Sequence, residues 1–267
     1  MKKIVFICLA SICLLQAREI RVVVPYYGSI RNRLVVESMD DLKDTAPLAG
    51  IYFQWIRPEK YQWNVFIYQS RNINYSNIIG SHFIFDYYPG RCPHGGLLLA
   101  GAGFDYIRIK TDGDISPQLS EFRMINNVYA PYFRFGRYID FGSSLKKVSF
   151  LPWGGIERDI IRGDLSFMIP SMAPGMPAPP PVDEDIKSDY TYALIGLNGK
   201  VTLYHFFEAT AKYYRKFSLD HGDDLNVFSG MLNVYLTRHW GLSYRFKYLE
   251  VSISTNTYHM GGIAFLF

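Results

Sequence analysis

The sequence predicts an all-β fold, a closed antiparallel up-and-down barrel of about twelve strands, on three observations. Polar and apolar residues alternate along one segment after another, as expected for strands with one polar and one apolar face. Aromatic residues make up 16% of the 267 residues and there are 22 glycines, a composition that favours strands over helices. The connections between the alternating segments are short and long in turn, which is typical of a barrel whose two ends differ.

The first predicted element is a signal peptide over residues 1–17. Two lysines precede an apolar run at residues 4–15, which is too short to span a bilayer comfortably, and a small residue suited to cleavage follows at Ala17. The alternatives are an uncleaved anchor and lipidation at Cys13, where a bulky isoleucine precedes the cysteine. We expect export, with cleavage after Ala17.

Residues 18–267 are predicted to form one domain of amphipathic strands. In residues 240–248, the even positions are Trp, Leu, Tyr, Phe and Tyr, and the odd positions are Gly, Ser, Arg and Lys. No stretch after the leader is apolar over about eighteen residues, so no transmembrane helix is expected. The predicted strands are 19–27, 47–57, 60–69, 78–88, 95–109, 123–139, 144–154, 188–198, 200–216, 225–238, 240–250 and 256–267. Losing the two weakest, 19–27 and 144–154, would leave about ten.

The predicted connections alternate in length. Short turns are expected at 57–60, 89–94, 140–143, 198–200 and 238–240, and longer connections at 28–47, 70–76, 110–122, 155–187, 218–224 and 251–255. The connection at 155–187 is rich in proline, which lacks the N–H needed for a sheet ladder. We expect it to be a long loop, which either folds into the barrel as a plug or stands out as a binding surface.

The last strand carries a resemblance to a known class of protein. Ile263, Phe265 and Phe267 alternate up to the C-terminus, which is similar to the closing strand of bacterial outer-membrane β-barrel proteins; His259 departs from this apolar pattern. The resemblance is architectural, covers the mature chain and points to no particular family. It implies an outer-membrane location, contact with membrane lipid and lipopolysaccharide, and recognition of Phe267 by the barrel-assembly machinery. It also makes 155–187 an extracellular loop.

A set of charged residues is predicted to face the barrel interior: His82, Asp86, Asp105, Arg134, Lys147, Glu208, Lys212, Arg245 and Lys247. His82 and Asp86 lie on one strand about 13 Å apart, too far for a direct acid–base pair. The basic excess favours a weakly anion-selective pore. Alternatively, the charges form interior ion pairs that rigidify a closed barrel. About twelve strands lies between filled small barrels and open porins, so size does not decide.

Composition and motifs narrow the function. The low share of charged residues excludes an intrinsically disordered chain. The 28 basic residues, two of them in the leader, are nearly balanced by 24 acidic ones, which excludes the positive excess of a nucleic-acid-binding surface. No metal, cofactor or catalytic residue is predicted, since no zinc spacing or phosphate loop occurs. We expect a narrow passive channel for small solutes. A surface-exposed structural or adhesive barrel is the alternative. A lipid-hydrolysing enzyme is less favoured, since no orienting acid accompanies His259 at a convincing spacing.

Overall fold

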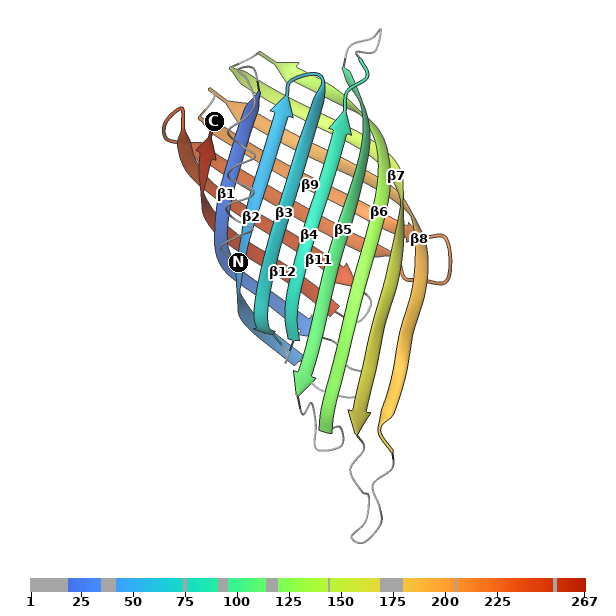
Figure 1. Cartoon of the computed structure of the whole chain (residues 1–267). Coiled ribbons are helices and arrows are strands. Elements are labelled where there is room, and N and C mark those ends of the chain that lie inside the picture. Colours follow the sequence, from blue (N-terminus) through green and yellow to red (C-terminus); the bar gives the residue numbers. More distant parts are fainter. Residues whose placement is uncertain are drawn as a thin grey trace.

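The protein is a closed antiparallel barrel of twelve strands (Figure 1). The computed structural model describes residues 19–34, 42–73, 76–90, 96–113, 120–143, 145–168, 180–204, 206–251 and 254–267. Each strand pairs with its neighbours in sequence, and β1 pairs with β12 to close the sheet. The predicted signal peptide and its cleavage site lie outside the described residues. Among the described residues, no helix is long and apolar enough to cross a membrane.

The strands are between 11 and 23 residues long. They are β1 (Ile20–Leu34), β2 (Leu42–Arg57), β3 (Tyr61–Ile73), β4 (Ser76–Tyr87), β5 (Leu97–Gly113), β6 (Ser120–Gly142), β7 (Lys146–Met168), β8 (Val182–Leu203), β9 (Phe207–Ser218), β10 (Leu225–Tyr235), β11 (Trp240–Val251) and β12 (Ser254–Leu266). The prediction of about twelve strands is confirmed. The ten-strand alternative is wrong, because both weak segments are parts of paired strands, β1 and β7.

The start of β1 and the C-terminal Phe267 lie at one end of the barrel, which we call the terminal end. Phe267 donates a backbone hydrogen bond to Arg21 there, with an N···O distance of 3.0 Å. The up-and-down order puts the β2–β3, β4–β5, β6–β7, β8–β9 and β10–β11 connections at the same end. The remaining connections lie at the opposite end, which we call the loop end.

Strands β7 and β8 correct the predicted loop at 155–187. The two strands pair continuously from Lys146 opposite Leu203 to Phe167 opposite Val182, so residues 155–168 and 182–187 belong to the sheet. Most of the proline run that suggested a loop lies at 169–179, outside the described residues. Strand β9 ends opposite Tyr192, so β7 and β8 continue past it at the loop end. We call residues 158–168 and 182–191 the projecting sheet (Figure 1).

The turn between β8 and β9 also differs from the prediction. The sequence Asn198-Gly199-Lys200 was predicted to be the turn, but the chain reverses only after Leu203. Asn198 pairs with Lys212 in the ladder, and its side chain accepts a hydrogen bond from Trp153 Nε1 at 3.0 Å. These contacts keep the short turn signal inside a long strand.

The outer surface of the barrel is apolar. On β6, Phe133 and Phe135 are 58% and 66% exposed, whereas the alternating Tyr132 and Arg134 are only 6% and 4% exposed. Large apolar side chains exposed in this way are unfavourable in water and favourable in hydrocarbon. Since the sheet is closed, no strand edge along the wall of the barrel is left unpaired in a bilayer.

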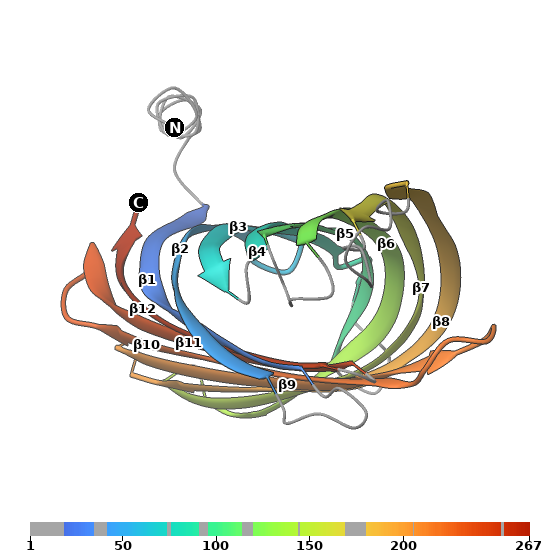
Figure 2. The ribbon, with the colours of Figure 1, turned by 90° about the horizontal axis from the view of Figure 1, so that it is seen from below.

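The barrel interior holds two apolar clusters rather than a single wide lumen. One cluster comes mainly from β1–β4 and β12 and includes Leu48, Tyr68 and Met260. The other comes from β4–β10 and includes Leu151 and Trp153. Seen from below, the cross-section is flattened, with β3–β5 facing β9–β11 across its short dimension (Figure 2). Polar residues meet across this dimension.

Candidate functional site

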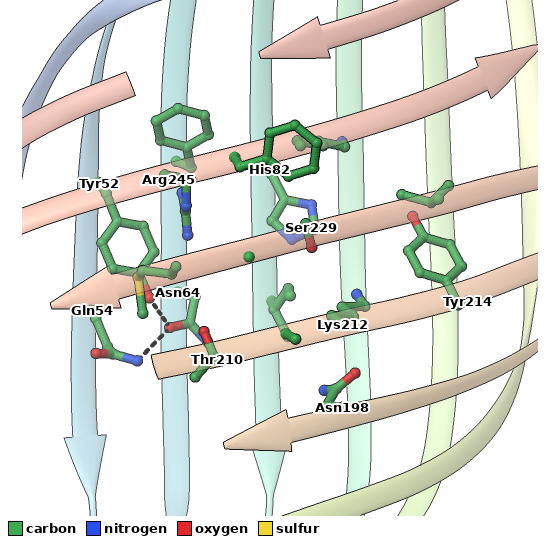
Figure 3. A pocket seen from close by; sticks show the side chains of 18 of the residues that line it. Tyr52, Gln54, Asn64, His82, Asn198, Thr210, Lys212, Tyr214, Ser229 and Arg245 are labelled. Atoms are coloured by element: carbon green, nitrogen blue, oxygen red, sulfur yellow. Dashed lines mark hydrogen bonds between the residues drawn. The ribbon is translucent and has the colours of Figure 1, made fainter. Parts of the chain in front are cut away.

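A cavity of about 260 Å³ lies between the two facing walls of the barrel. We call it the polar seam, because charged and amide side chains from β2–β6, β8, β9 and β11 meet in it (Figure 3). All but one of the charged residues predicted to face the interior line it: His82, Asp86, Asp105, Arg134, Glu208, Lys212, Arg245 and Lys247. The polar faces of β4, β9 and β11 therefore converge in one space.

Lys147 lies elsewhere. Its side chain is 43% exposed, and its Nζ is 2.8 Å from Asp140 Oδ2. Lys147 is the second residue of β7, so it sits at the rim of the terminal end although it alternates with the inward-facing Ser149. It does not reach the polar seam.

Asp86 and Arg134 form a buried bidentate ion pair. Arg134 Nη2 lies 2.8 and 2.6 Å from the two Asp86 carboxylate oxygens, and Arg134 Nε lies 3.1 Å from Oδ1. Gly101 occupies the strand between them; a Cβ there would lie 2.5 Å from Asp86 Oδ1 and 3.0 Å from Arg134 Cγ. The missing side chain of Gly101 thus makes room for the pair, whose bidentate charge-assisted hydrogen bonds are shorter and stronger than neutral ones.

His82 pairs with Asp105 rather than with Asp86. The two residues are direct cross-strand neighbours on β4 and β5, and His82 Nδ1 contacts Asp105 Oδ1. The prediction that His82 and Asp86 do not pair directly agrees with this geometry. Sequence reasoning missed both actual partners, because strand register is not visible in one strand's alternation.

Three further ion pairs, two of them made by Lys216, were missed or only half predicted. Lys216 contacts Glu157 and lies 3.4 Å from Asp159 Oδ2, and all three are buried. Both carboxylates fall in the segment predicted to be a loop, which is why they were not assigned to the interior. Lys200 Nζ lies 2.7 Å from Glu208 Oε2 near the terminal end.

Lys212, Arg245 and Lys247 have no carboxylate within salt-bridge distance among the described residues. Lys212 Nζ lies 5.1 Å from the Trp153 ring centroid and 4.5 Å from that of Tyr214. Arg245 Cζ lies over the ring of Tyr52 at 4.3 Å. Aromatic faces therefore offset part of the desolvation of two of these cations.

Neutral hydrogen bonds complete the seam. Asn64 Oδ1 accepts from Tyr52 Oη at 2.7 Å, from Gln54 Nε2 at 3.0 Å and from Gln62 Nε2 at 3.1 Å (Figure 3). This cluster ties β2 to β3 on one wall of the seam. It leaves a polar, hydrogen-bonded surface between the two apolar clusters.

The C-terminal residues lie on the opposite side of the sheet. Ile263, Phe265 and Phe267 are exposed on the outer surface, while the alternating Ala264 is fully buried. His259 is also exposed, and its Nδ1 lies 2.6 Å from Tyr244 Oη. The predicted insertion signal is therefore an outward-facing apolar row.

Comparison with known proteins supports the fold. No protein-family model matches the sequence, and no curated protein matches it significantly. Among solved structures, the translocator domain of the autotransporter NalP from Neisseria meningitidis has a TM-score of 0.52 and 14% identity, over 100% of this chain and 95% of that chain. The beta domain of the Bordetella autotransporter BrkA has a TM-score of 0.45 and 10% identity, over 91% and 98%. The CymD monoaromatic hydrocarbon channel has 0.41 and 11%, over 96% and 90%.

At these identities the likeness concerns the fold and not the activity. The architecture shared with the first of these structures agrees with the closed twelve-strand sheet and its apolar outer face. The chain therefore has the closed β-barrel fold found in bacterial outer-membrane proteins, as the resemblance of its last strand predicts.

Proposed function

We propose that the protein is a narrow passive channel for small polar solutes. The observation that carries this proposal is the position of the polar seam within the barrel. Its lining runs from Glu208, the second residue of β9 near the terminal end, to Val227, the third residue of β10 near the loop end. A cavity with charged lining that extends along the barrel in this way suits solute passage better than purely structural packing.

The two apolar clusters set the width of this proposed path. They occupy both sides of the flattened interior, so only the space between the facing walls is available to a solute. A barrel of this strand number is wide enough to leave such a gap but not a porin-sized channel. The proposal therefore assigns small solutes to the protein and gives it no catalytic role.

Conductance of the purified barrel in planar bilayers tests the proposal. We expect small discrete steps from the unmodified protein. Ser229→Trp, which fills the middle of the seam, should abolish most of the conductance. Phe228→Trp is the matched control, because Phe228 is the preceding residue on the same strand and is exposed on the outer face. The proposal fails if no steps appear, either in the intact chain or after deletion of residues 170–179 to remove a plug.

A second function, surface binding, is favoured by the projecting sheet. Among the described residues no strand pairs with β8 beyond Tyr192 on its outer edge, and an open edge can accept an extended peptide as a further strand. The edge carries Asp183, Glu184 and Asp185, so a basic peptide would complement it. Binding of an alternating Lys–Val peptide, measured by fluorescence anisotropy, should be lost when residues 162–187 are replaced by a short turn. Equal binding by the shortened barrel would reject this function.

A further inference from the structure

We propose that the polar seam contains a binding station for a small oxyanion, such as phosphate or a short carboxylate, centred on Ser229 and formed by Lys212, Lys247 and Arg245. This inference rests on the proposed channel for the route by which the anion arrives. The station itself is argued from charge, register and desolvation, which are independent of conductance.

Lys212, Arg245 and Lys247 are the cations of the seam that have no carboxylate within salt-bridge distance among the described residues. Two of the three carboxylates that line the cavity have a cationic partner, Asp86 in Arg134 and Glu208 in Lys200, and the third, Asp105, contacts the imidazole of His82. No further carboxylate lines the cavity among the described residues. Lys212, Arg245 and Lys247 face a single carboxylate without a salt-bridged lysine or arginine, Asp105, so the β9–β11 wall carries an excess of positive charge.

Strand register places the cations around one point. Lys212 and Lys247 are both cross-strand partners of Ser229, on β9 and β11 respectively. Since neighbouring strands are about 4.8 Å apart, the two lysine backbones are separated by about 10 Å, and long side chains can reach an anion held between them. Arg245 lies two residues from Lys247 on the same face. Figure 3 shows the side chains of Lys212, Ser229 and Arg245, which come from the neighbouring strands β9, β10 and β11 and line one cavity.

Desolvation supplies the driving force. The three cations are half-buried between two apolar clusters, where an uncompensated charge is costly. Lys212 and Arg245 make cation–π contacts with aromatic rings, but Lys247 contacts neither a carboxylate nor a ring among the described residues. The Ser229 hydroxyl likewise has no protein hydrogen-bond partner in the described part of the chain. A bound oxyanion would give Lys247 a counter-charge and Ser229 an acceptor, which is charge-assisted hydrogen bonding of the strong kind.

Equilibrium binding of inorganic phosphate to the full-length barrel in detergent tests the station. Trp153 is a built-in reporter because Lys212 lies over its ring. At constant ionic strength, phosphate should change tryptophan fluorescence saturably, and Trp153→Phe should remove that signal. Lys247→Met and Lys212→Met should each weaken binding by about tenfold or more, since each removes a charged hydrogen-bond donor. Lys247→Met is followed through the intact Trp153, while Lys212→Met is followed by calorimetry.

Lys147→Met is the matched control, because it removes the same charge at the exposed rim, outside the cavity. It should leave the affinity unchanged, and heat-modifiable migration on gels should show that every variant is folded. No saturable binding, or equal weakening by Lys147→Met, would overturn the station. Phosphate binding without conductance would reject the channel and support the station. Conductance without phosphate binding would support the channel and overturn the station.

Discussion

The Asp86–Arg134 pair gives the sharpest test of how the interior is held together. Its two side chains are 2% and 4% exposed, so both charges are largely removed from solvent. Asp86→Asn keeps the shape of the side chain and removes its charge, which leaves Arg134 buried without a counter-charge. Breaking one side of such a pair typically costs about 3–5 kcal/mol.

The comparison that matters is with the double variant. Replacing both residues, as in Asp86→Asn with Arg134→Met, removes the orphaned charge together with the pair. Exchanging a buried pair for apolar volume is often close to neutral, so much of the loss should be recovered. The residual cost should come from the contact between Arg134 and the Trp153 ring, whose centroid lies 5.6 Å from the guanidinium carbon.

Urea unfolding of the barrel in lipid vesicles, followed by tryptophan fluorescence, measures these differences. Gly101→Ala is a second probe, since its Cβ would lie 2.5 Å from Asp86 Oδ1 and push the pair apart. Gly199→Ala is its control, because the nearest atom to a Cβ there is 4.0 Å away. If Asp86→Asn costs less than about 1 kcal/mol, a value typical of exposed pairs, the assignment of a desolvated pair is refuted. A double variant as unstable as the sum of the two singles would refute it equally.

Three other predictions address the outer face, assembly and the loop end. Phe135→Arg should destabilise the barrel by about 2–4 kcal/mol if Phe135 lies near the midplane, whereas Thr210→Arg on the seam should cost much less in the same urea assay. Phe267→Ala should slow assembly by the cellular barrel-assembly machinery but leave refolding of purified protein into vesicles unchanged; an equal effect on both would point to stability alone. A hydrogen bond from the Ser218 backbone N–H and a second one from the Arg215 side chain hold the pKa of Asp224 below its ordinary value of 3.8. Because that pKa is lowered, the order of the 219–224 loop should persist above about pH 4 and fade as the pH falls further, which amide exchange at different pH values can follow.

The sequence was sufficient for the strand faces because a period of two survives errors in strand boundaries. In β11, Ser243 is buried while Leu242 and Tyr244 are exposed, as the alternation predicts. The same reasoning could not find the partners of His82 or Asp86, since a pair across two strands depends on register. Gly101 is a signal that could have been read: a glycine within a strand often marks a close approach of neighbours.

Boundaries failed where tertiary pairing outweighs local turn chemistry. The Asn198-Gly199 dipeptide has strong turn propensity, yet it lies within the long β7–β8 ladder and Asn198 also holds the Trp153 indole. The projecting sheet escaped prediction for a related reason. Beyond the bilayer a strand needs no apolar face, so the alternation that marks the other strands fades while pairing continues.

Alternation identifies which residues point into the barrel but not whether they form an apolar core or line a cavity. In this barrel the inward residues do both. Inward apolar residues gather on the two sides of the flattened cross-section, where they act as a core, as in a soluble sandwich. Inward polar residues gather between them, where the walls face each other. On one wall the charges are neutralised by cross-strand pairs, which stabilise the barrel. On the other wall Lys212, Arg245 and Lys247 have no carboxylate within salt-bridge distance among the described residues, which costs stability unless a solute or water meets them. Uncompensated charge maintained at such a cost is the feature of this interior that structural packing alone does not explain, and it lies where a channel would need it.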